Sequence, residues 1–222
     1  MMQSAAERKQ ERLNSGLENT LTAGVYNAIL IGFVLYGFIV NALMVNFMTP
    51  VFYGMDYTAF LIGYFVCVFA GTFCARSDKP LMSFLGYNLI VLPIGALLCQ
   101  VMPVYTSVVN EAILLTGAIT LTIMTLATIF PHWFEGMGRT LGICLLAGLV
   151  LSLASWLIGF SDNFLVWGFA ILFTLYIGYD VCRSQVYPKT VDNAIDCALD
   201  LYLDIINLFL KIMRILARAR RD

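Results

Sequence analysis

Long apolar stretches alternate with short polar connections along almost the whole chain. Each stretch has about 20 residues, which is enough for a helix to cross a hydrocarbon core of roughly 30 Å. The seven stretches that we identify are residues 23–47, 57–75, 80–102, 110–130, 138–160, 163–182 and 194–216. The pattern therefore predicts an all-α membrane protein in which seven transmembrane helices form a bundle.

Composition excludes two other classes of protein. The chain has 222 residues, of which 60% are hydrophobic and 12% are charged, whereas a soluble domain carries about 25% charged residues. The formal net charge is −1, so the chain offers no basic surface for nucleic acid. We therefore expect neither a soluble globule nor a nucleic-acid-binding protein, and we expect the lipid bilayer to be its surroundings.

The polar and apolar segments divide the chain into three parts. We predict a cytoplasmic amino-terminal segment over residues 1–22, a seven-helix transmembrane domain over 23–216 and a basic tail over 217–222. The connections between the helices are too short to hold a second domain. The first segment lacks a short apolar core followed by a small-residue cleavage site, so we predict no cleavable signal peptide.

The positions of the basic residues predict the orientation in the membrane, because Lys and Arg beside helix ends stay in the cytoplasm. They occur before the first helix and in the connections that follow the second, fourth and sixth helices, namely Arg8, Lys9, Arg12, Arg76, Lys79, Arg139, Arg183 and Lys189. The other three connections contain no Lys or Arg. We therefore expect the amino terminus to be cytoplasmic.

The last helix leaves two alternatives open. Seven crossings would place the carboxyl terminus outside, whereas the basic residues at its end favour the cytoplasm, namely Lys211, Arg214, Arg218, Arg220 and Arg221. Either this segment crosses the membrane despite its basic end, or it is re-entrant.

Acidic residues within the last two helices are the strongest candidates for function. Asp196, Asp200 and Asp204 recur every four residues, which places three carboxylates on one stripe of a helix. Asn207 lies near the same stripe, and Asp180 ends the sixth helix. Asp204 lies about 15 Å into its segment at 1.5 Å per residue, where an ionisable group is costly and is by default a functional one.

The alternative to a functional role is that the last helix is only half-buried. Its aspartates would then face water, with Arg183 or Lys189 as their partners. This alternative applies best to Asp196, which is close to the connection.

The residue types indicate the chemistry of this stripe. Carboxylates suit a hard cation such as calcium, and the stripe lacks the His or Cys that zinc or copper would need. Two carboxylates within a few ångströms cannot both ionise cheaply, so they share a proton and titrate as a unit. The residues alone leave a channel, a carrier and a sensor open.

One run of sequence resembles a known family. Residues 201–210, Leu-Tyr-Leu-Asp-Ile-Ile-Asn-Leu-Phe-Leu, and the following Arg214-Ile215-Leu216 closely resemble the final helix of the Bax-inhibitor (transmembrane BAX-inhibitor-motif) family. Tyr179-Asp180 at the end of the sixth helix is also similar. The resemblance implies a bundle with the last helix at its centre, acting as a pH-sensitive calcium leak channel. It implies a bacterial inner membrane rather than an organelle membrane.

The resemblance also assigns roles to residues. It implies that Asp180 and Asp204 form a hydrogen-bonded pair that senses protons and could hold calcium, and that Arg76 engages Asp180 when the channel changes state. Asp200, Asp196 and Asn207 join Glu111 as candidates for the ion pathway. A solvated glutamate at a helix start is the alternative for Glu111.

Two observations count against a simple transfer of these roles. Val181-Cys182 follows Asp180 where the family often has Thr-Gln, and Asp200 stands where many bacterial relatives have a small polar residue. A turn near Pro188 would place Asp180 level with Asp196, so helix tilt or a longer sixth helix must supply the contact with Asp204.

Other functions remain as alternatives. One is a proton-coupled cation carrier. Another is an intramembrane aspartyl protease, but Tyr202-Leu203 precedes the second aspartate instead of Gly-x-Gly, and no Pro-Ala-Leu element follows. We predict that the protein is not an enzyme, that it needs no organic cofactor, and that calcium, transported or weakly bound, and protons are its partners. No motif for a membrane-protein partner is present.

Overall fold

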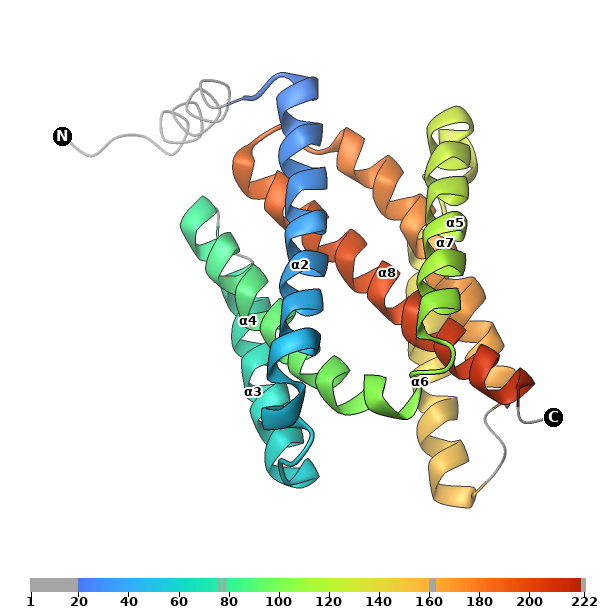
Figure 1. Cartoon of the computed structure of the whole chain (residues 1–222). Coiled ribbons are helices and arrows are strands. Elements are labelled where there is room, and N and C mark those ends of the chain that lie inside the picture. The colour runs from blue at the N-terminus through green and yellow to red at the C-terminus, as the bar shows by residue number, and fades with distance from the viewer. Residues whose placement is uncertain (1–19, 76, 78, 160–162, 221–222) are drawn as a thin grey trace.

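The computed structural model describes residues 20–75, 77, 79–159 and 163–220. Within these ranges the protein is helical and contains no strand. The long helices are α2 (Ala23–Phe52), α3 (Tyr57–Cys74), α4 (Pro80–Val101), α5 (Val109–Ile129), α6 (Gly138–Ile158), α7 (Asn163–Val186) and α8 (Val191–Ala219) (Figure 1). Two short 3-10 helices, η1 (Met102–Val104) and η2 (Pro131–Trp133), precede α5 and α6. The predicted seven-helix architecture is confirmed.

Five helices, α2, α4, α5, α6 and α7, are long and apolar enough to cross a membrane. The apolar helix α3 is shorter. Helix α8 spans 29 residues but carries acidic residues along its first half. Together with the family described below, these helices make the chain an integral, multi-pass membrane protein.

Local sequence explains where several helices begin and end. The side chains of Thr22, Asp56 and Thr190 accept hydrogen bonds from backbone N–H groups three residues later, which caps α2, α3 and α8. Pro80 occupies the first turn of α4, where its missing N–H costs no hydrogen bond. Gly159 follows α6 with a φ of 73°, which only glycine adopts without strain.

Helix α8 lies at the centre of the bundle, as the family resemblance implies. It packs against α7, α2, α5 and α4, whereas the remaining large contacts join α2 with α4, α3 with α4, α5 with α7 and α6 with α7. Two groups of helices, α2–α4 and α5–α7, therefore flank α8, which runs obliquely between them (Figure 1).

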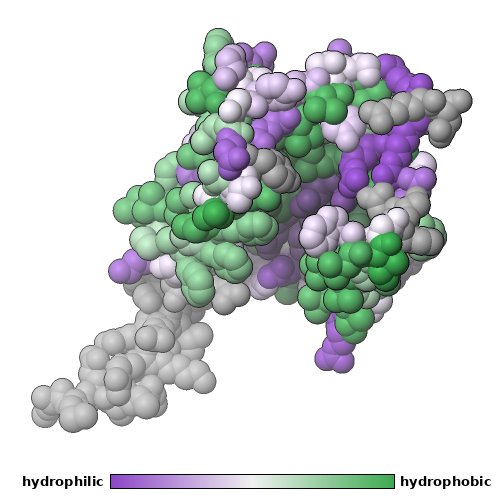
Figure 2. Space-filling view, turned by 90° about the horizontal axis from the view of Figure 1, so that it is seen from below, coloured by the Kyte–Doolittle hydropathy of each residue, from purple (hydrophilic) through white to green (hydrophobic). Residues whose placement is uncertain are grey.

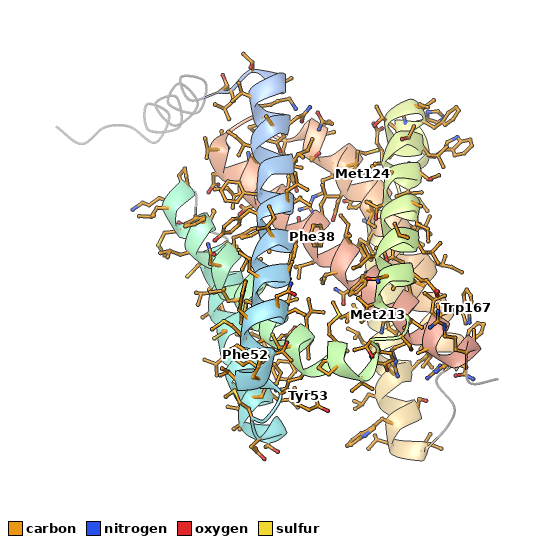
Figure 3. The ribbon with its side chains drawn as sticks, in the orientation of Figure 1. Phe38, Phe52, Tyr53, Met124, Trp167 and Met213 are labelled. Atoms are coloured by element: carbon orange, nitrogen blue, oxygen red, sulfur yellow. The ribbon has the colours of Figure 1, made fainter. Side chains whose placement is uncertain are left out.

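Side chains follow this arrangement. Met213 of α8 is fully buried between the helices, while Trp167 of α7 is 58% exposed on the outside of the bundle (Figure 3). Phe38 of α2 reaches α8, where its ring centroid lies 5.4 Å from that of Tyr202.

The two ends of α8 lie at opposite ends of the bundle. At the first end, the backbone N–H of Leu21 donates to the carbonyl of Lys189 at 2.7 Å. At the other end, Arg220 pairs with Glu111 at the start of α5. Helix α8 is continuous between these points, and whether it crosses the membrane or is re-entrant stays a prediction. The side of the membrane that each end faces stays a prediction.

Two glycines bring α3 and α4 into close contact. A Cβ atom on Gly86 would lie 2.6 Å from the backbone nitrogen of Ala75 and 2.7 Å from the carbonyl oxygen of Gly71. Both neighbours are backbone atoms of α3 or its end, which cannot turn aside as a side chain can. Small residues allow helix backbones to approach in this way.

We expect Gly86→Ala to lower the melting temperature of the purified protein in detergent by about 3–10 °C, since overpacking costs about 1–3 kcal/mol. The matched control is Gly63→Ala in α3, where nothing lies within 4 Å of the added atom. There alanine should leave the melting temperature unchanged or raise it slightly, because alanine favours helix over glycine. Equal effects of the two changes would contradict the close contact.

Candidate functional site

Asp180 of α7 and Asp204 of α8 meet inside the bundle. The two side chains are buried, with 7% and 8% of their residues' surface exposed. Their carboxyl groups lie close enough to interact with each other. Oδ2 of Asp204 is buried and receives no hydrogen bond from any described residue. A proton on one of the two carboxyl groups supplies the donor that this contact needs.

The connection between α7 and α8 brings this pair together. Helix α7 continues to Val186, four residues beyond its predicted end, and Thr190 has an extended backbone with φ −104° and ψ 160°. The start of α8 consequently lies beyond the end of α7 (Figure 1). This offset places Asp204 against Asp180. Antiparallel counting from a turn at Pro188 would place Asp196 there instead.

One glycine of α7 and one of α6 keep α7 in position around Asp180. Cβ atoms on Gly178 or Gly138 would collide with the rings of Phe134 and Tyr179, respectively. Phe134 directly follows η2, and Gly138 begins α6. Aromatic rings packed on bare backbone therefore fix the last turns of α7, and with them the carboxylate of Asp180.

Arg183 provides a positive charge at the edge of the pair. Its Nη1 lies 3.7 Å from Oδ1 of Asp180, one turn earlier on α7, and 3.3 Å from Oδ2 of Asp200 on α8. Its Nε donates to the hydroxyl of Tyr187 at 2.6 Å. The guanidinium therefore makes one ion pair within α7 and one that links α7 to α8. The side chains of Arg183 and Asp200 are 39% and 41% exposed, so this link lies at the more open edge of the site.

The site contains the carboxyl groups of Asp180, Asp200 and Asp204 and the guanidinium of Arg183, which pairs with the first two. The formal charge of these four groups is negative when all are ionised. A shared proton or a passing cation would lower the repulsion. Within the described ranges no group of three His, Cys, Asp or Glu residues could hold a metal ion.

The other candidate residues lie apart from the pair. Asp196 is half-buried near the start of α8, where it contacts Ser83 of α4. The amide of Asn207 donates to the carbonyl of Leu203 in its own helix at 2.8 Å. Glu111 is exposed at the far end of the bundle and pairs with Arg220 at 2.5 Å. Arg76 lies outside the described residues.

The structure thus joins Asp180, Asp204 and Asp200, and it adds Arg183. Sequence reasoning used Arg183 for orientation and as a partner of water-facing aspartates. The three-residue spacing from Asp180 to Arg183 is a local signal for an ion pair on a helix. The contact between Arg183 and Asp200 has no such signal, because it depends on the offset of α8.

Comparison with known proteins adds independent information. A family model described as "Inhibitor of apoptosis-promoting Bax1" matches residues 18–221. The protein "Bax inhibitor 1" of Saccharomyces cerevisiae is 38% identical over 105 residues, which are 45% of this chain and 33% of that protein. An "Uncharacterized protein" of Helicobacter pylori is 40% identical over 83 residues, 36% of this chain and 35% of that protein. The chain therefore matches about a third of the length of these curated relatives.

Proposed function

The chain belongs to the Bax-inhibitor family, whose model covers most of its length, and on this basis we propose that it is a calcium leak channel that responds to pH. The observation that carries the proposal is the buried contact between the carboxyl groups of Asp180 and Asp204. Ionisable groups inside a membrane domain are costly and mark ion or proton pathways. A pair of them on the central helix and its main neighbour supports a gate at this position.

The chemistry of the gate follows from the charges around the pair. With a shared proton, Asp180 and Asp204 carry one negative charge and hold α7 against α8 by a hydrogen bond. When this proton leaves for water, the two carboxylates repel each other, and each needs another partner. Arg183 already touches Asp180, and calcium accepts carboxylate oxygens in flexible geometry. Loss of the proton therefore weakens the α7–α8 contact and favours cation entry.

The wider pathway includes the remaining acidic residues. Asp200 and Asp196 continue the stripe of Asp204 toward the start of α8, and we propose that they attract cations to that end. Asn207 and Glu111 lie along the other half of the route. The resemblance adds Arg76 as a second cation for Asp180. We place the protein in a bacterial inner membrane with its amino terminus in the cytoplasm.

A flux measurement tests this proposal. The purified full-length chain is reconstituted into liposomes that contain a calcium-sensitive dye, and calcium is added outside at pH values from 6 to 8. We expect calcium entry above that of protein-free liposomes, a rate that rises with calcium concentration without saturating, and a dependence on pH. Calcium entry equal to that of protein-free liposomes would overturn the proposal that the protein is a channel. Saturable calcium entry that is coupled to proton movement would instead indicate a proton-coupled cation carrier.

A further inference from the structure

Tyr202 of α8 is enclosed on the side of the helix that faces α2 and α4. Its residue is fully buried, and its ring centroid lies 5.4 Å from that of Phe38 and 6.1 Å from that of Tyr87. A Cβ atom on Gly37 of α2 would lie 2.8 Å from Cδ2 of Tyr202, so the ring occupies the space that a side chain there would fill. This close packing leaves Tyr202 little freedom to turn or slide.

A hydrogen bond fixes the far end of the same side chain. The hydroxyl of Tyr202 accepts from the side-chain amide of Asn41 on α2, a residue that is 3% exposed. Breaking such a bond is costly, because it leaves buried polar groups without a partner. Neither an amide nor a phenol changes its charge between pH 6 and pH 8. The bond therefore persists over the range in which we expect Asp180 and Asp204 to exchange protons.

Tyr202 and Asp204 lie on opposite sides of α8. Two residues of an α-helix are separated by about 200° of rotation, since each turn takes 3.6 residues. Accordingly, Asp204 meets Asp180 of α7 while Tyr202 meets α2. Any rotation of α8 about its own axis would move both side chains together. The bond to Asn41 on one side therefore sets the direction in which Asp204 points on the other.

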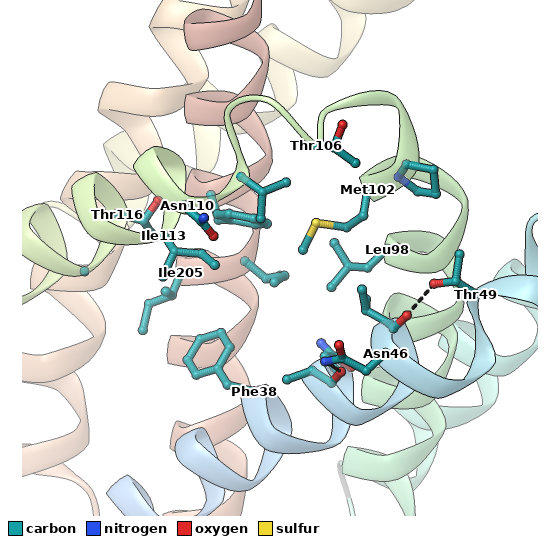
Figure 4. Close-up of a pocket in the computed structure, with 18 residues that line it drawn as sticks. Phe38, Asn46, Thr49, Leu98, Met102, Thr106, Asn110, Ile113, Thr116 and Ile205 are labelled. Carbon is teal, nitrogen blue, oxygen red and sulfur yellow. Dashed lines mark hydrogen bonds between the residues drawn. The ribbon is translucent and has the colours of Figure 1, made fainter.

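A crevice of about 870 Å³ opens beside α8 just after this contact. Phe38 of α2, Ile113 of α5 and Ile205 of α8 line it (Figure 4). Helices α2 and α5 are not among the helix pairs with substantial contact, and from below the molecule is hollowed between two blocks of largely apolar side chains (Figure 2). The α8 residues in the crevice wall all follow Tyr202, namely Ile205, Ile206 and Phe209. Beyond Tyr202, α8 therefore faces open space on this side.

The other polar contact between α2 and α8 lies farther from Asp204. The hydroxyl of Tyr26 lies 3.4 Å from Sγ of Cys197 and 3.5 Å from the carbonyl oxygen of Asn193. Both residues are at least seven positions before Asp204, whereas Tyr202 is two positions before it. In the described part of the chain, the bond between Asn41 and Tyr202 is thus the polar support from α2 that is nearest to Asp204.

We propose that Asn41 and Tyr202 are a positioning pair, which fixes the rotation of α8 and so presents Asp204 to Asp180. The inference deepens the proposed function and rests on it for the consequence for calcium entry. Its consequence for the two carboxyl groups is separate, because their protonation can be measured without calcium.

The groups around the carboxyl pair indicate that Tyr202 acts through the placement of the helix. Among the described residues, the charged or titratable groups that interact with Asp180 and Asp204 are Arg183, Tyr176 and Asp200. Tyr202 interacts instead with Asn41, Tyr87 and Tyr64. Removing its hydroxyl therefore changes no group that touches the carboxyl pair, and a change in the titration of the pair reports a change in position.

Infrared spectroscopy tests the positioning pair. The full-length protein is placed in phosphatidylcholine nanodiscs, and the carbonyl band of a protonated carboxyl group is followed over a pH series. The band that Asp204→Asn removes identifies the pair. We expect Tyr202→Phe, which keeps the ring, to move the midpoint of this band to lower pH by about 0.4–1 unit, the range of one hydrogen bond. A looser contact weakens both the hydrogen bond of the protonated pair and the repulsion of the ionised pair, and both changes favour proton loss.

A control and a second variant accompany this measurement. Tyr36 of α2 donates to Oδ1 of Asn88 on α4 at 2.8 Å, so Tyr36→Phe makes the same chemical change without touching α8 and should keep the wild-type midpoint. Asn41→Leu has nearly the shape of asparagine and should shift the midpoint as Tyr202→Phe does. The double variant should shift it no further than either single change, because both changes break the same bond.

An unchanged midpoint in Tyr202→Phe, or an equal shift in Tyr36→Phe, would overturn the positioning pair. Asn41→Leu decides the question in the same way if Tyr202→Phe does not fold. Calcium entry into liposomes is measured in parallel, and its pH dependence should shift in Tyr202→Phe by the same amount as the infrared midpoint. Absence of calcium entry in the wild type would overturn the channel alone, since the infrared midpoints would still decide whether the pair positions Asp204.

Discussion

Asp204→Asn is expected to remove the pH dependence of calcium entry, so that rates at pH 6 and pH 8 agree within about twofold, since a pair of carboxyl groups titrates as a unit only while both can exchange protons. The asparagine amide has nearly the same shape as the carboxyl group. It can donate a hydrogen bond to Asp180 permanently, which reproduces the protonated contact at every pH. The measurement is the liposome assay over the same pH series.

The matched control is Asp196→Asn. It makes the same chemical change on the same stripe of α8, two turns earlier and away from Asp180. We expect this variant to keep its pH dependence. An equal loss in both variants would assign the response to the total charge of α8 instead of the pair, and a full response in Asp204→Asn would remove Asp204 from the gate.

Arg183→Gln is expected to raise calcium entry at pH 7 roughly two- to fivefold, which corresponds to losing one partly exposed ion pair. Two effects act in the same direction. The guanidinium is a positive charge beside the carboxylates, so its removal makes the local potential more favourable for a cation. It also links Asp180 of α7 with Asp200 of α8, and without that link the two helices separate more easily at this end.

Two further variants isolate the role of the charge. Arg183→Lys keeps a cation at this position and should stay closer to the wild type than Arg183→Gln. Lys189→Gln removes a cation from the connection that follows α7, but Lys189 donates to the carbonyl of Gln185 and lies over the ring of Tyr26. We expect it to have wild-type flux. A rise in Lys189→Gln as large as in Arg183→Gln would show that surface charge in general, and not this link, controls entry.

The helices could be predicted closely because the information is local. A segment must hold about 20 apolar residues to cross a bilayer, and most of the predicted helix ends agree with the structure to within a few residues. The largest differences are at α2, which continues five residues beyond the predicted 47, and at α7, which continues four beyond 182. Pro50 lies within the last turn of α2, although the Thr49-Pro50 pair reads as a connection in the sequence.

The candidate site could be predicted only in part. The four-residue spacing of the aspartates identified their shared stripe, and the resemblance selected Asp180 and Asp204 from the acidic residues. Counting residues from the connection indicated Asp196 as the neighbour of Asp180. This prediction was wrong because the extended connection at Thr190 shifts α8 along α7. No residue pattern encodes that displacement.

The amino-acid sequence alone therefore defines the elements and their chemistry: seven helices, a scarcity of charge, and carboxylates concentrated in the last two helices. These follow from the length and period of apolar segments, which are properties of neighbouring residues. Which charges meet depends instead on how the helices pack. Whether Arg183 reaches Asp200, or Asp204 reaches Asp180, depends on how far one helix is displaced along another. Close packing of rings and glycines across the whole bundle sets that displacement.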